Sequence, residues 1–245
     1  MKILKEFGQF IMMFSGMFKA PENKVMYWKQ FMQQCHDIGL KSLGIISIIS
    51  FFIGAVSTLQ TAYQMISPLI PPTTIAQIVR DTIILEFAPT LSCIVLAGVI
   101  GSRIASELGN MRVSEQIDAL EIMGINTKTY LILPKILAGV TMIPLLIIIS
   151  MVLGIIGGRM VGSIAGIIDS SIFDKGLRMG FLAYNVFFAL IKSFVFAFFI
   201  TAVPSYYGYY VKGGALEIGQ NSTRAVVVSC VLLLAADYIL SALLL

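Results

Sequence analysis

Polar side chains interrupt stretches of this sequence that are otherwise strongly apolar. Those at membrane depth or near its edge are Gln60, Glu86, Lys192 and Asp237. A charge at the centre of a membrane-spanning helix costs about 2.5 to 3.5 kcal/mol on insertion scales, so such residues face a partner or a cavity. Lys192 and Asp237 carry opposite charges on separate apolar segments. We expect either an ion pair between them or a relay that passes protons or ions through the membrane.

The longest polar interruption, residues 101–135, carries acids at helical spacing. One side of the predicted short helix holds Glu115, Asp118 and Glu121. The opposite, apolar side holds Ile117, Leu120 and Met123. Ile122 is the exception, because it falls on the acidic side. We expect Ser114 to cap this helix and Gly124 to end it.

Such a helix, acidic on one side and apolar on the other, is typical of an element that docks a cytoplasmic partner when it lies between two membrane spans. The alternative is an ordinary solvated loop helix. The sequence favours the first interpretation because the acids and the apolar residues are segregated.

Motifs for ATP hydrolysis or covalent catalysis are missing from the sequence. No lysine follows a glycine, which excludes a P-loop, and neither HExxH nor GxSxG occurs. His36 is the only histidine, and Cys35, Cys93 and Cys230 are too far apart for a metal motif. We therefore expect no metal, no cofactor and no enzyme activity in this chain. An intramembrane enzyme is the weakest alternative, and any ATP would be bound by another chain.

The composition predicts a protein that crosses a membrane several times. Of the 245 residues, 58% are hydrophobic and 12% are charged, and the mean hydropathy is +0.91. Soluble domains carry about 25% charged residues. The net charge of +4 is small and scattered, so no nucleic-acid partner is expected.

Two amphipathic stretches precede the predicted spans. In residues 1–20 an apolar stripe runs from Phe7 to Phe18, and Pro21 is expected to end the helix. Residues 23–38 repeat the pattern. We predict that residues 1–39 form helices lying in the membrane plane. Their lysines place the amino terminus in the cytoplasm.

Residues 40–245 are predicted to form a bundle of about five transmembrane helices, which makes the chain one all-α domain. The expected spans are approximately 40–64, 85–106, 130–161, 181–206 and 225–245, with the carboxyl terminus outside. A short helix over residues 74–85 precedes the second span, and Pro89 is expected to separate the two.

Small residues recur every four positions in two of the predicted spans. One ridge consists of Gly154, Gly158, Gly162 and Gly166. The other consists of Ala97, Gly101, Ala105 and Gly109. In a membrane such ridges let another helix approach closely, so we expect tight helix packing along both.

The run ELGNMRVSEQIDALEIMGI resembles the cytoplasmic loop of MlaE/YrbE-type permeases. These are the membrane subunits of ABC transporters that move phospholipids or other lipids together with MCE-domain proteins. The preceding span resembles the same family in LEFAPTLSCIVLAGVIGSRIASELG, and the last two spans do so in IKSFVFAFFITAVPSYYGYY and STRAVVVSCVLLLAADYILSALLL. The resemblance covers roughly residues 35–245.

The resemblance implies a homodimer in the bacterial inner membrane, seated on a dimer of ATPase subunits. The loop at about residues 107–128 would then carry the coupling helix that enters the ATPase. The residues at matching or near-matching positions are Glu115, Gln116, Asp118, Glu121 and Met123. Phospholipid would bind at the dimer interface and pass to or from a periplasmic MCE-domain protein.

The resemblance also implies a lipid pocket at the dimer interface, open toward the outside and lined by the first span, the short helix and the last span. Its candidates here are Leu59, Gln60, Tyr63, Ile84, Glu86 and Phe87. The family's Arg-Glu-Leu-Gly-Pro element reads Leu-Glu-Phe-Ala-Pro at residues 85–89, so the acid and the proline remain while the arginine and the glycine do not. For the apolar candidates, the alternative is ordinary packing or lipid contact. The alternatives for the whole chain are a gradient-driven secondary transporter and a membrane scaffold that transports nothing.

Overall fold

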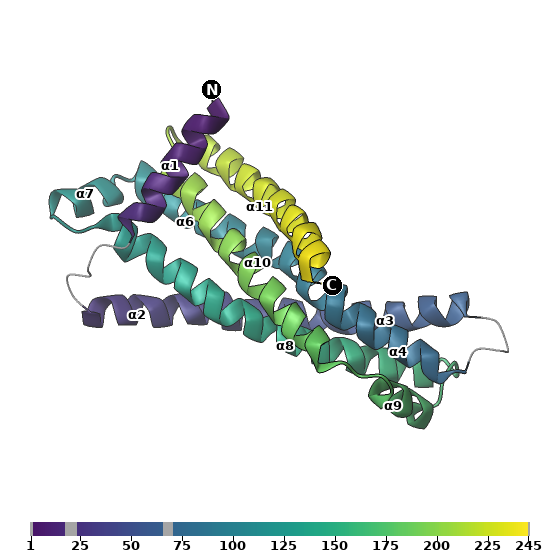
Figure 1. Cartoon of the computed structure of the whole chain (residues 1–245). Helices are drawn as coiled ribbons and strands as arrows, with labels where there is room; N and C mark the ends of the chain where they lie inside the picture. The colour runs from purple at the N-terminus through teal and green to yellow at the C-terminus, as the bar shows by residue number, and fades with distance from the viewer. Residues whose placement is uncertain (1, 18–23, 66–70, 245) are drawn as a thin grey trace.

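The computed structural model describes residues 2–17, 24–65 and 71–244. In these ranges the chain is helical apart from short connections (Figure 1). Five helices are long and apolar enough to cross a membrane: Val25–Gln64, Thr73–Val113, Lys128–Ile164, Ala183–Tyr209 and Ala215–Leu244. The predicted all-α class with five spans is confirmed, and the chain is a multi-pass membrane protein.

The first span begins well before the predicted boundary at residue 40. Helix α2 (Lys24–Cys35) continues through a π-helical turn, η1 (His36–Leu40), into α3 (Lys41–Gln64). The Arg103 guanidinium donates to the carbonyl of Asp37 over 2.6 Å and ties this turn to the second span. The amphipathic segment before residue 40 and the first span are therefore one continuous helix.

Helix α1 (Lys2–Gly16) packs against the bundle as well as facing outward. The Phe10 ring lies 5.9 Å from that of Tyr206, and the Phe14 ring lies 5.7 Å from that of Phe198. Met13 has no exposed surface. The described part of the predicted apolar stripe thus contacts the protein, and Pro21, expected to end this helix, lies outside the described residues.

The second span and the short helix before it form one continuous helix. It comprises α4 (Thr73–Thr82), η2 (Ile83–Leu91), α5 (Ser92–Leu96), η3 (Ala97–Gly101) and α6 (Ser102–Val113). The expected separation at Pro89 is wrong, because Pro89 lies inside η2. A π-helical turn is wider than an α-helical one and accommodates a residue that has no N–H to donate.

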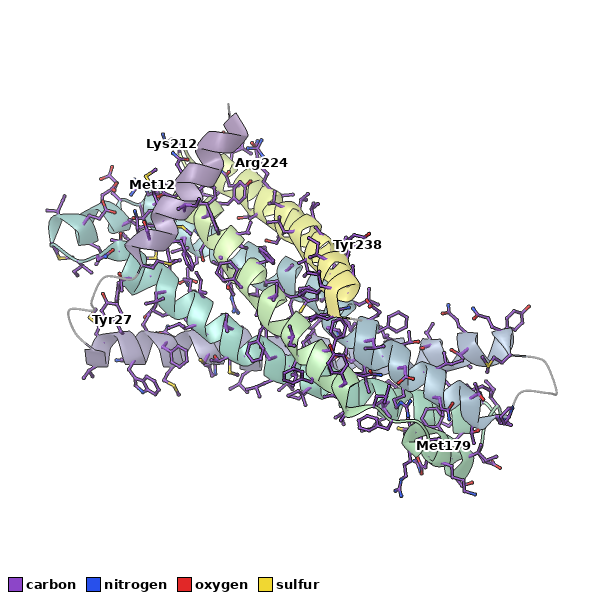
Figure 2. The ribbon with its side chains drawn as sticks, viewed as in Figure 1. Met12, Tyr27, Met179, Lys212, Arg224 and Tyr238 are labelled. Carbon is purple, nitrogen blue, oxygen red and sulfur yellow. The ribbon has the colours of Figure 1, made fainter. Side chains whose placement is uncertain are left out.

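The remaining elements complete the bundle and its two ends. They are α7 (Gln116–Ile122), η4 (Lys128–Ile132), α8 (Leu133–Ile164), α9 (Ser170–Arg178), α10 (Ala183–Tyr209) and α11 (Ala215–Leu244). Helices α7 and α9 lie at opposite ends of the molecule (Figure 1). Lys212 and Arg224 lie near α1, far from Met179 at the end of α9 (Figure 2).

Glycines allow α3 and α8 to touch backbone to backbone. A Cβ atom on Gly54 would overlap the carbonyl group of Gly154, and one on Gly157 would overlap the carbonyl oxygen of Phe51. Gly158 and Gly162 face Thr58 in the same contact. The predicted ridge is confirmed up to Gly162. Gly166 follows the end of α8 instead and has a φ of 66°.

The second predicted ridge is also confirmed. Gly101 lies against Pro204 of α10, and Gly109 lies against Ile218 of α11. From the other side, a Cβ atom on Gly208 would fall 2.7 Å from the carbonyl oxygen of Ala105. Helix α6 and its preceding turn therefore fit closely between the last two spans.

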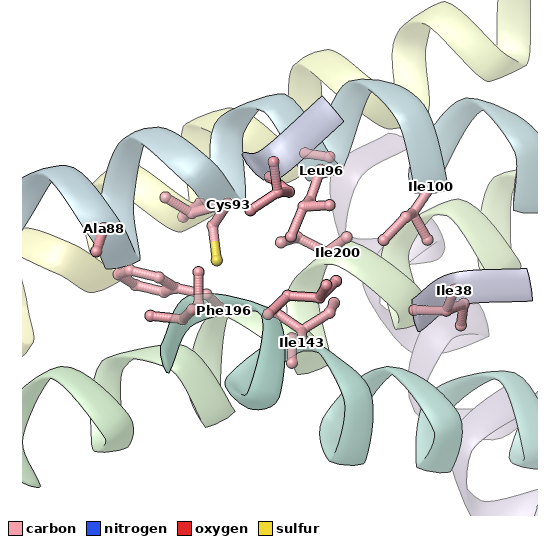
Figure 3. Packing of buried hydrophobic residues seen from close by; sticks show 14 of the residues in the cluster. Ile38, Ala88, Cys93, Leu96, Ile100, Ile143, Phe196 and Ile200 are labelled. Carbon is pink, nitrogen blue, oxygen red and sulfur yellow. The ribbon is translucent and has the colours of Figure 1, made fainter. Parts of the chain in front are cut away.

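The core between the spans is apolar with a chain of hydroxyls beside it. Figure 3 shows Cys93, Leu96 and Ile100 of the second span facing Ile143 of α8 and Phe196 of α10. The hydroxyls of Ser50, Ser150 and Ser92 follow one another at 2.7 and 2.9 Å and join three spans. In a bilayer, such packing and interhelical hydrogen bonds hold helices together, because lipid tails are as apolar as the side chains.

Candidate functional site

An open hollow lies beside the carboxyl-terminal end of α3. Its volume is about 710 Å³, and its walls are Leu59, Gln60, Ala62, Tyr63, Gln64 and Ile167. Most of the wall is apolar, with two amides at its edge. Three of the predicted lipid-pocket residues, Leu59, Gln60 and Tyr63, line it.

A smaller hollow of about 290 Å³ lies further along the same helix. It is lined by Phe52, Ile53, Val56, Ser57, Gln60, Phe87 and Leu91. Gln60 borders both hollows, and Phe87 borders the smaller one. Ile84 and Glu86 line neither: Ile84 is 4% exposed within the core, and Glu86 contacts Lys192.

Lys192 is the centre of a charge cluster that joins three spans. Its ammonium has no exposed surface and lies 2.9 Å from Glu86 and 2.7 Å from Asp237. It also donates to the carbonyl of Leu85 and lies over the Phe188 ring. The predicted contact between Lys192 and Asp237 is present, although it is a close ionic contact without hydrogen-bond geometry. The sequence had not indicated that Glu86 shares the same cation.

Helix α7 starts differently from the sequence prediction. Ser114 does not cap it, because its hydroxyl donates to the carbonyl of Asn110 over 2.7 Å and closes α6. Glu115 has a left-handed φ of 60° and occupies the cap position instead. Gly124, with a φ of 82°, ends the helix as predicted: its N–H reaches the carbonyl of Glu121.

Two of the acids of α7 form hydrogen bonds with residues at the ends of other helices. Asp118 accepts a 2.7 Å hydrogen bond from Arg112, and the Glu121 carboxylate accepts from Tyr209 over 2.8 Å. Ile117 is fully buried beneath the helix, whereas Ile122 is 86% exposed.

Met123 was expected on the apolar side of the helix, but it is 65% exposed. Periodicity alone could not show these orientations, because the partners Arg112 and Tyr209 come from the ends of other helices. The sequence analysis did not predict Arg112, Tyr209 or Thr127 as partners of the acids in α7. Arg112 nevertheless lies only six residues before Asp118.

The opposite end of the bundle is held by two arginines. Arg80 is 3% exposed and donates to the carbonyls of Leu177 and Met179 over 2.8 Å each. Arg159 donates to both carboxylate oxygens of Asp174 and so lowers the pKa of that carboxyl below its ordinary value. Helix α9 is thereby fixed against the spans.

No cluster of His, Cys, Asp and Glu suited to a metal ion occurs among the described residues. What the structure does contain is a helical bundle with five potential membrane spans, an apolar hollow, an intramembrane charge cluster and a short helix at one end. These features define a multi-pass membrane protein of the helical-bundle class. Residues 31–243 match the family Permease MlaE, and the chain belongs to that family.

Its relatives come from several lineages. The chain is 34% identical to a probable ABC transporter permease protein of Rickettsia bellii over 88% of this chain and 83% of the relative. It is 30% identical to the intermembrane phospholipid transport system permease protein MlaE of Haemophilus influenzae, over 94% and 88%. It is 32% identical to the chloroplastic protein TRIGALACTOSYLDIACYLGLYCEROL 1 of Arabidopsis thaliana, over 88% and 61%.

Proposed function

We propose that this chain is the permease subunit of an ABC transporter that moves phospholipid between the inner membrane and a periplasmic MCE-domain protein. The observation that carries the proposal is the apolar hollow of about 710 Å³ beside Leu59, Gln60 and Tyr63. Family membership and the phospholipid transport named for the Haemophilus relative support it. The lipid is the cargo, and the chain itself performs no bond chemistry.

The hollow suits a lipid in its chemistry. Acyl chains occupy apolar walls, and polar groups at the edge orient a headgroup. Leu59 and Tyr63 are 39% and 79% exposed, and within the described residues only Ile167 lines the hollow from outside α3, so the wall is incomplete. A second copy of the chain supplies the missing wall in our proposal, which places the lipid at a homodimer interface.

Energy comes from a separate ATPase that docks on α7. The chain has no P-loop, whereas α7 exposes Ile122 and Met123 at the end of the molecule opposite α9. Glu115 and Gln116 are exposed beside them. Closure of the ATPase would push α7 and tilt the spans that it joins. In this orientation the amino terminus is cytoplasmic, while α9 and the carboxyl terminus face the periplasm.

The docking surface is tested by Ile122→Asp. A charge at an exposed apolar contact of a cytoplasmic helix should leave the permease folded, but it should abolish co-purification with the ATPase subunit. Leu216→Asp is the matched control, because Leu216 is 76% exposed at the start of α11. Retained ATPase binding in Ile122→Asp would contradict docking through α7.

The charge cluster at Lys192 favours one rival, a secondary transporter driven by an ion gradient. That function predicts lipid or solute transport by the purified chain alone in vesicles with an imposed proton gradient. Our proposal predicts no transport under those conditions without the ATPase and ATP.

A further inference from the structure

The Glu121 carboxylate of α7 belongs to a compact triangle of oxygens at the ends of the spans. Its Oε1 atom lies 2.8 Å from the Tyr209 hydroxyl and 3.0 Å from the Thr127 hydroxyl, and these two hydroxyls lie 2.8 Å apart. Tyr209 and Thr127 are 4% and 2% exposed. Two buried hydroxyls therefore hold the Oε1 atom of Glu121, although Glu121 is itself an exposed residue on a helix at the surface.

Only two protons are present for the three contacts of this triangle. A carboxylate only accepts, while each hydroxyl donates once. Three arrangements are possible: both hydroxyls donate to Glu121, or one hydroxyl donates to the other while that one donates to Glu121, in either order. In each of them at least one of the two hydroxyls donates a charge-assisted hydrogen bond to Glu121, which is the stronger kind.

The triangle joins α7 to two spans, and a neighbouring contact adds a third. Tyr209 is the last residue of α10, and Thr127 immediately precedes η4 at the start of the third span. Arg112, near the end of α6, bonds Asp118 over 2.7 Å and lies over the Tyr209 ring at 5.8 Å. Any displacement of α7 therefore pulls on the ends of the second, third and fourth spans together.

Helix α10 leads from this triangle toward the charge cluster inside the membrane. Tyr209 and Lys192 lie on the same helix with Pro204 between them, seventeen residues apart (209 − 192), or about 25 Å along its axis. Lys192 in turn contacts Glu86 and Asp237. One helix thus connects the surface helix with the charges that join the spans.

We propose that Glu121 is a positioning residue that transmits the movement of α7 to α10 through Tyr209 and Thr127, rather than a residue that contacts the ATPase. This inference rests on the proposed docking of an ATPase on α7. The inference assigns two different roles to residues at the end of α7. Ile122 and Met123, which are 86% and 65% exposed, would meet the partner, while Glu121 would hold α7 to the bundle through its Oε1 atom.

The test is Tyr209→Phe in the complete complex, reconstituted with its ATPase in phospholipid vesicles. The variant removes one hydroxyl and keeps the ring over which Arg112 lies. We expect unchanged co-purification of the ATPase and continued ATP hydrolysis. Lipid transferred per ATP should fall about tenfold, which corresponds to about 1.4 kcal/mol of coupling free energy.

Tyr210→Phe is the matched control. Tyr210 is the next residue, and its hydroxyl has no hydrogen-bond partner among the residues that the structure describes. It should keep the wild-type ratio of lipid to ATP. Glu121→Gln retains an acceptor oxygen and should lose less coupling than Glu121→Ala.

Thr127→Val provides a second route if Tyr209→Phe does not fold, because it removes the other hydroxyl from the same carboxylate. An unchanged ratio of lipid to ATP in the folded variants, with the ATPase bound, would overturn the inference and leave the proposed function standing. Loss of ATPase binding in Glu121→Ala would instead make Glu121 a docking residue. A wild-type chain that binds no ATPase would overturn both proposals.

Discussion

Lys192 has no exposed surface and faces two carboxylates from neighbouring spans. Removing one partner of a buried ion pair leaves an uncompensated charge, which costs about 3 to 5 kcal/mol. Lys192→Met keeps the length of the side chain and removes the charge. We expect it to lower the midpoint of thermal unfolding in detergent substantially.

The control for this prediction is Lys175→Met in α9. Lys175 is exposed, and no ion pair to it occurs among the described residues. Surface substitutions usually change stability by less than about 0.5 kcal/mol. Equal unfolding midpoints for Lys192→Met and Lys175→Met would contradict a stabilising role for the cluster.

Single residues show how far sequence reasoning reaches here. The contact between Lys192 and Asp237 was predictable, because charged side chains inside a membrane usually pair with an opposite charge. The contact between Glu86 and Lys192 was not predictable, because it depends on how η2 is rotated relative to α10. Ser114 had the right type for a helix cap, but α6 runs up to it and its hydroxyl closes that helix instead.

Helices α3 and α8 meet at glycines on both sides, so their packing is sensitive to a single methyl group. At Gly54 the added atom would meet the backbone of Gly154, which cannot move aside as a side chain can. We expect Gly54→Ala to cost about 1 to 3 kcal/mol through overpacking. Thermal unfolding and the yield of folded protein in detergent measure the effect.

Gly44→Ala in the same helix is the control, since nothing lies within 4 Å of its added Cβ atom. The control should be neutral or slightly stabilising, because alanine favours a helix more than glycine does. If Gly54→Ala were equally harmless, the backbone contact between α3 and α8 would be contradicted.

At the scale of elements, the spans and ridges were predictable from hydropathy and from the spacing of small residues. The glycine Gly54 on the opposing helix was missed, because a lone glycine in α3 forms no repeat. Pro89 was misjudged, because a proline predicts a break only where the helix cannot widen into a π turn. Which side of α7 faces the bundle could not be predicted, because it depends on tertiary contacts.

At the scale of the whole molecule, the hollow beside α3 and the exposed end of α7 lie in different parts of the bundle. The continuous helices of the second and fourth spans run between these two regions (Figure 1). The second span contributes Phe87 and Leu91 to the smaller hollow, so in our proposal a movement of α7 reaches that hollow along the second span. The resemblance in sequence pointed to Leu59, Gln60 and Tyr63 of the hollow, whereas this linkage depends on how the helices pack.

Native mass spectrometry of the complex purified on this chain from its own membrane tests the account most directly. We predict two copies of the chain, two ATPase subunits and bound phospholipid. Leu59→Trp, which fills the hollow, should lose the lipid, while Leu232→Trp on α11, at a leucine of similar exposure, should retain it. A chain without ATPase and lipid, or lipid retained in full by Leu59→Trp, would contradict the account.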